Sequence, residues 1–146
     1  MKKALFVFLF TASLTTLLAQ SSVVFKTEEG AIHGYDPVAY FKVGKPVAGS
    51  KEFSYDYNGA TWHFSSKENL ETFKANPEKY SPQYGGYCAF GASQGHKAAT
   101  EVDAWSIVND KLYFNYNKSV QAQWKKNQSE LIKKADETWP TIKNQK

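Results

Sequence analysis

The chain has 146 residues, of which 42% are hydrophobic and 16% are aromatic, and a formal net charge of +4. All of its 18 basic residues are lysine, and the lysines are scattered along the chain. Because arginine is the usual residue for bidentate contacts to phosphates and base edges, this modest and dispersed charge argues against a nucleic-acid-binding protein.

The first twenty residues have the pattern of a secretory signal peptide. Two lysines provide a positive start, residues 4–18 form an apolar run, and the small residue Ala19 offers a cleavage point there or after Gln20. The run is shorter than the roughly 20 residues that a membrane span needs. We therefore predict that residues 1–20 are removed, that the protein is periplasmic or secreted, and that no membrane span remains.

What remains, residues 21–146, has the length of one domain. Residues 23–26 indicate a short strand, and residues 28–36 indicate a loop. Asp36 and Pro37 then have the residue types of a helix cap and a first helical position, which predicts a short helical turn.

A hairpin is the clearest element of the next segment. Residues 52–57 alternate between polar and aromatic side chains, and residues 61–64 form a second β-type run. The two runs flank Asn58-Gly59, a strong hairpin signal. Phe53, Tyr55 and Tyr57 are expected on one face of the first strand.

A helix is expected directly after this hairpin. Ser65 and Glu68 have the spacing of a capping box at its start. The residue before a proline disfavours the helical conformation, so the helix should end near Asn76, which precedes Pro77.

The C-terminal half predicts a second hairpin and one or two helices. The hairpin comprises residues 105–108 and 111–116, and Asn117 can cap the helical region that follows. Asn127 divides this region into two helices in one interpretation, and Pro140 is expected to end it. Together these elements predict an α+β fold: a small antiparallel sheet of two hairpins packed with two or three helices, one domain with a C-terminal helical extension.

Cys88 is the only cysteine, so no intramolecular disulfide is available to the chain. It follows Gly85 and Gly86, whose backbone freedom would allow N–H groups to point at the sulfur. A thiolate held in this way would be a nucleophile or a metal ligand. The alternative is that Cys88 is a small buried hydrophobic residue with no reactivity.

The histidines are the other candidate metal ligands. His96 lies eight residues after Cys88 and could share a soft metal with it or activate the thiol. His63 lies in the first hairpin, where packing in the strand and metal ligation both remain open. His33, beside a glycine, is expected to face solvent.

The chain resembles the YHS-domain family. The family pattern starts with Asp-Pro, which is followed by a hairpin of glycine and aromatic residues and by a helix capped by serine. It ends with the motif Asn-Pro-x-x-Tyr. These segments are residues 34–41, 59–66 and 73–80. The chain looks like the exported branch described as YHS domain-containing (seleno)proteins, which continues with Gly85-Gly86-Tyr87-Cys88-Ala89.

The resemblance has two implications for chemistry. Short YHS modules are suspected of binding metal through two cysteines, but the matching positions here are Ala39 and Asn69. The exported branch has one cysteine after Gly-Gly-Tyr, replaced by selenocysteine in some relatives, which implies redox or soft-metal chemistry at Cys88.

Three hypotheses for function follow. In the first, the protein is an exported binding module that holds a soft transition metal, copper, through Cys88 with His96 and His63 as further ligands. In the second, it is a thiol-dependent redox enzyme that uses Cys88 on a peroxide or a small thiol. In the third, it is a structural or ligand-binding module with an inert Cys88. The oligomeric state is left open.

Overall fold

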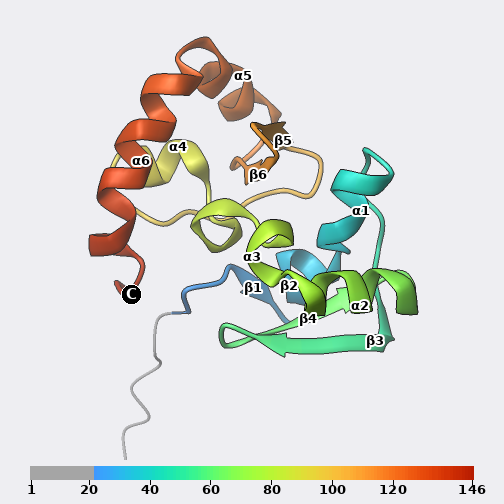
Figure 1. Cartoon of the computed structure of the whole chain (residues 1–146). Coiled ribbons are helices and arrows are strands. Elements are labelled where there is room, and N and C mark those ends of the chain that lie inside the picture. Colours follow the sequence, from blue (N-terminus) through green and yellow to red (C-terminus); the bar gives the residue numbers. More distant parts are fainter. Residues whose placement is uncertain (1–21) are drawn as a thin grey trace, which may run out of the picture.

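A computed structural model of the chain describes residues 22–146, and the predicted signal peptide lies outside the described residues. Figure 1 shows two groups of elements: strands β1–β4 with helices α1–α3, and helices α4–α6 with strands β5 and β6. The fold is mixed α+β, as predicted. The described residues include no helix long and apolar enough to cross a membrane.

The described chain starts with a very small hairpin. Strand β1 (Lys26–Thr27) pairs with β2 (Gly30–Ala31), followed by a 3-10 turn, η1 (Ile32–Gly34). The predicted strand over residues 23–26 is therefore shifted toward its C-terminal end. The expected loop over residues 28–36 contains short regular elements.

Helix α1 (Pro37–Lys42) starts as predicted, with Asp36 as its cap. The predicted hairpin is also present: β3 (Ser50–Tyr57) pairs with β4 (Ala60–Phe64) in antiparallel register. Its turn residues Asn58 and Gly59 have φ values of 51° and 76°, which fit the primed turns that match strand twist.

Helix α2 (Lys67–Ala75) ends just before Asn76, close to the expected position, and α3 (Pro77–Tyr80) follows at once. The predicted capping box is wrong by one residue. Ser66, not Ser65, caps α2 by accepting the N–H of Asn69, because the hydroxyl of Ser65 is bonded elsewhere, to Asp36.

The glycine-rich segment contains the 3-10 turn η2 (Gln83–Gly86) and helix α4 (Ala89–Ser93). The second predicted hairpin follows as β5 (Trp105–Val108) and β6 (Lys111–Phe114). The hairpins do not join into one sheet, since each of the three forms its own two-stranded sheet among the described residues.

Two helices complete the chain, α5 (Lys118–Lys126) and α6 (Gln128–Ile142), with Asn117 capping the first and a break at Asn127. The prediction that Pro140 ends the helix is wrong. Pro140 lies in the last turn of α6, and that turn is still closed by the N–H of Lys143 to the carbonyl of Trp139 at 2.9 Å.

The hydrophobic core consists of two clusters. The first is centred on Phe73 of α2, whose ring contacts those of Trp62 and Phe64 at centroid distances of 5.4 and 5.1 Å. The second surrounds Trp124 and is formed mainly by η2, α4, α5 and α6. Each large side chain buried in this way contributes about 1.5–3 kcal/mol, so packing stabilises the fold without a disulfide.

Candidate functional site

Cys88 lies at the start of α4 and only 2% of the residue is exposed. Its Sγ accepts the backbone N–H of Gly91 at 3.4 Å and that of Tyr116 at 3.3 Å. The predicted convergence of N–H groups on the sulfur is therefore present, although the donors come from α4 and from the residue after Asn115, not from the glycines that precede Cys88.

The remaining polar neighbour of Cys88 is Asn115, which is fully buried. The thiol donates to Oδ1 of Asn115 at 3.5 Å, and the same oxygen accepts the N–H of Phe90 at 3.2 Å. The sulfur thus accepts two backbone N–H groups and donates to one side-chain oxygen. The Nδ2 of Asn115 has no hydrogen-bond partner among the described residues.

His96 lies near Cys88 but is exposed. Its backbone N–H binds the carbonyl of Gly91, and its Nε2 lies 3.3 Å from the point that a Cβ on Gly91 would occupy. The two candidate residues therefore contact the same glycine. Within residues 22–146, no three His, Cys, Asp or Glu side chains come together as a group able to hold a metal ion.

His63 lies on β4 and 8% of the residue is exposed. Its Nδ1 is 3.0 Å from Oγ of Ser54, and that hydroxyl donates its proton to the carbonyl of Lys51 at 2.6 Å. Ser54 can therefore only accept from the ring, which places the imidazole proton on Nδ1. Nε2 is left with its lone pair, and no hydrogen bond within the described part of the chain uses it.

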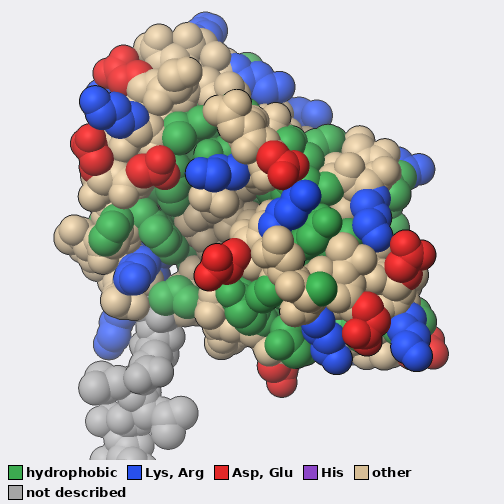
Figure 2. Space-filling view, viewed as in Figure 1, with side chains coloured by type: hydrophobic (Ala, Val, Ile, Leu, Met, Phe, Trp, Pro, Cys, Tyr) green, Lys and Arg blue, Asp and Glu red, His purple; other side chains and the backbone are tan. Residues whose placement is uncertain are grey.

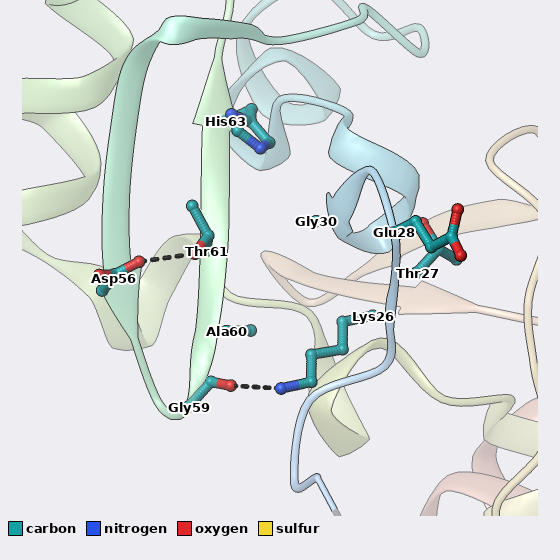
Figure 3. A pocket seen from close by; sticks show the side chains of 9 residues that line it. All are labelled: Lys26, Thr27, Glu28, Gly30, Asp56, Gly59, Ala60, Thr61 and His63. Carbon is teal, nitrogen blue, oxygen red and sulfur yellow. Dashed lines mark hydrogen bonds between the residues drawn. The ribbon is translucent and has the colours of Figure 1, made fainter.

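Nε2 of His63 points into a cleft between the β1–β2 hairpin and the β3–β4 hairpin, as Figure 3 shows. The cleft has a volume of about 590 Å³. Lys26 closes one end through a 2.9 Å hydrogen bond from Nζ to the carbonyl of Gly59. Glu28 lines the opposite wall, and Asp56 lines the hairpin side.

A smaller cavity of about 350 Å³ lies next to this cleft, and both are lined by His63 and Glu28. His33 and Glu29 also line this smaller cavity. His33 does not simply face solvent as predicted: it is half-buried, and its Nε2 lies 2.7 Å from the carbonyl oxygen of Thr100. Of these two histidines, His63 is the one whose Nε2 has no hydrogen bond within residues 22–146.

Two glycines allow His63 to sit as it does. A Cβ on Gly30 would lie 2.7 Å from Cδ2 of His63, and one on Gly49 would lie 2.6 Å from its Cβ. Any other residue at either position would displace the histidine. The glycines are visible in the sequence, but their contact with His63 depends on tertiary structure.

The positions matching the presumed cysteine ligands of short YHS modules surround Asp36, which is fully buried. Oδ1 of Asp36 accepts the N–H groups of Val38 at 2.9 Å and Ala39 at 3.3 Å. Oδ2 accepts the backbone N–H and hydroxyl of Ser65 and, at 2.7 Å, the amide of Asn69. Five donors occupy this carboxylate, so the region does not fit a metal ion.

Comparison with known families identifies a YHS domain at residues 37–84. This segment runs from α1 into η2, where it ends at Tyr84, and it includes His63 but not Cys88 or His96. The YHS domain is associated with suspected metal binding. No curated protein and no solved structure matched the chain.

Proposed function

We propose that this protein is an exported binding module that holds a transition-metal ion in the cleft beside His63. The observation that carries the proposal is the Nε2 of His63, which has no hydrogen-bond partner among the described residues and faces the cleft between the β1–β2 hairpin and the β3–β4 hairpin of the YHS domain. Neutral imidazole is a common ligand of zinc and copper.

The partner of His63 supports this interpretation. A metal-binding histidine usually donates its other ring N–H to a nearby acceptor, which fixes the tautomer and the ring orientation. Ser54 fills that role here at 3.0 Å. The exposed carboxylates of Glu28 and Asp56 line the same cleft but are not grouped with His63, and Asp56 accepts the hydroxyl of Thr61 at 2.7 Å. One preplaced nitrogen with exposed oxygen donors suits weak, exchangeable binding, with water completing the coordination.

For Cys88 we propose a structural role. Its sulfur caps α4, receives two N–H donors and has its own proton donated to Asn115. Copper ligation by Cys88 with His96, and redox catalysis by the thiol, would both require the sulfur to leave these partners. The inert-thiol hypothesis requires no such change.

Export is part of the proposal and depends on the signal-peptide pattern of residues 1–20. A periplasmic or secreted location would also expose the cleft to metal ions outside the cytoplasm. The metal named here, zinc or copper, follows from imidazole chemistry and includes the copper predicted from the sequence.

The test is calorimetric titration of the purified protein with Zn²⁺ and with Cu²⁺. We expect the substitution His63→Gln to weaken binding by at least about tenfold, since it removes the only preplaced nitrogen ligand. His96→Gln is the matched control, because it removes an exposed imidazole outside the cleft. Cys88→Ser measures the contribution of the thiol.

If His63→Gln leaves the affinity unchanged, the cleft is not the site. If Cys88→Ser alone abolishes binding, the soft-metal site predicted at the cysteine is correct instead. Thiol modification as a function of pH, with and without Cu(I), separates the redox hypothesis: a fast reaction at low pH would contradict the structural role of Cys88.

A further inference from the structure

A second cavity lies where the YHS domain meets the C-terminal helix α6. Its volume is about 520 Å³, within the usual range for small-molecule sites. It shares no residue with the His63 cleft. We call it the α6 groove, and define it by Tyr57, Trp62, Glu78, Tyr84, Asp136 and Trp139. Figure 2 shows hydrophobic side chains together with acidic and lysine side chains on the face that includes this junction.

Aromatic rings form the walls of the α6 groove. Tyr57 and Trp62 come from the β3–β4 hairpin, Tyr84 from η2 and Trp139 from α6. The rings of Tyr84 and Trp139 meet edge to face at 5.9 Å, while Tyr57 and Trp139 are only partly buried and leave surface for a ligand. Aromatic faces carry partial negative charge, so such walls favour a cation.

The polar residues of the groove include carboxylates from α6 and α3. The hydroxyl of Tyr84 donates to Oδ1 of Asp136 at 2.9 Å, which positions the carboxylate. Burial is the main cause that raises the pKa of Tyr84, and the hydrogen bond to Asp136 raises it further. The hydroxyl therefore keeps its proton and remains a hydrogen-bond donor. Pro140 also lines the groove and has no N–H to offer the carbonyl of Asp136 four residues earlier. Glu78 adds a second carboxylate from α3.

The backbone around Tyr84 is fixed in an uncommon conformation. Tyr84 has a φ of 55°, in the left-handed region. Gly85 follows, and a Cβ there would lie 1.8 Å from the carbonyl oxygen of Val23. This close approach and the hydrogen bond from Phe25 N–H to the carbonyl of Gly85 hold the ring of Tyr84 against α6. The groove is therefore preorganised.

From these contacts we propose that the α6 groove binds a small organic cation that carries an ammonium group. The apolar part of the ligand would lie against Tyr57 and Trp139, and the ammonium would donate to the carboxylates of Asp136 and Glu78. Among the side chains that line the groove, two carry a carboxylate, Asp136 and Glu78, and one carries an ammonium group, Lys143. This charge balance disfavours an anion and gives a neutral molecule no advantage.

The experiment is a titration of the ¹⁵N-labelled protein with benzylamine, which is protonated at neutral pH, followed by NMR. We expect saturable shifts of the Trp139 indole N–H and the Gly85 amide. Benzyl alcohol, the neutral analogue, and phenylalanine, a zwitterion, should bind at least about fivefold more weakly. Phenylalanine carries an ammonium group and a carboxylate, so its weaker binding would indicate a simple amine as the ligand and not an amino acid.

Asp136→Asn removes the charge but preserves the size of the side chain and its ability to accept from Tyr84. We expect this change to weaken benzylamine binding by about fivefold or more. Glu137→Gln is the matched control, since Glu137 is the next residue of α6, is exposed and does not line the groove. Equal binding of benzyl alcohol, or an unaltered affinity in Asp136→Asn, would overturn the proposal.

Discussion

Cys88 and His63 are both buried polar residues, with 2% and 8% of their surface exposed, yet their surroundings leave them with different capacities. The sulfur of Cys88 receives two N–H donors, and its proton goes to Asn115. The imidazole of His63 has one partner, Ser54, and one nitrogen that faces a cavity. The sulfur of Cys88 has its hydrogen bonds within the fold, whereas Nε2 of His63 has none among the described residues.

This difference shows why burial alone is a poor guide to function. A buried polar group that has all its partners contributes to stability, and one that keeps an unpaired atom toward a cavity is available to a ligand. By this criterion Asp36, with five donors on its carboxylate, resembles Cys88. Substitutions at or beside Cys88 and His63 test this difference.

The largest effect on stability is expected from Cys88→Ala. The change removes the shared acceptor of the N–H groups of Gly91 and Tyr116 and leaves a small void, so the free energy of unfolding should fall by about 2–4 kcal/mol. Cys88→Ser, which restores a smaller acceptor, should lose less. Urea denaturation measures both, and equal stability of Cys88→Ala and the unmodified protein would refute a structural role.

Gly30→Ala should have an intermediate effect. The new Cβ would lie 2.7 Å from Cδ2 of His63, at a backbone φ of +114°. We expect a loss of about 1–3 kcal/mol from strain and overpacking, together with weaker metal binding. Gly44→Ala is the control, because φ there is +71° but nothing lies within 4 Å. If both variants lose the same stability and retain metal binding, the contact between Gly30 and His63 is unimportant.

Ser54→Ala should have the smallest effect on stability, about 1 kcal/mol or less, because Ser54 is exposed. Its effect on the imidazole should be larger. Without the serine acceptor the proton is free to move to Nε2, and we expect metal affinity to fall by about tenfold. Ring ¹⁵N shifts of His63 report the tautomer directly, and an unchanged tautomer in the variant would contradict the role given to Ser54.

Local sequence signals predicted much of the fold. The Asn58-Gly59 turn, the cap at Asp36 and the break at Asn127 depend on residues close together in the chain, and each is where the sequence indicated. The error at Ser65 had a distant cause, since its hydroxyl binds a carboxylate 29 residues away. The strand expected over residues 23–26 was displaced by pairing and burial that no local pattern contains.

The candidate site was less predictable for the same reason. A single cysteine is conspicuous in a sequence, and that drew attention to Cys88. The availability of His63 depends on Ser54, nine residues away, and on Gly30 of another hairpin. The α6 groove was not foreseen, because Tyr84 and Asp136 are 52 residues apart. Unfilled hydrogen-bonding capacity is a property of tertiary structure.

The attachment of Ser22 has a consequence for the maturation of the chain. The carbonyl of Ser22 accepts from the hydroxyl of Tyr87 at 2.9 Å and from the ammonium of Lys97 at 3.3 Å. If a peptidase cuts after Ala19 or Gln20, the bond that it cleaves lies only two or three residues before Ser22 in the chain. An extended chain spans about 3.3 Å per residue, so this bond would be close to the folded domain. We therefore expect cleavage to be faster in the unfolded chain, where Ser22 is released, than in the folded one.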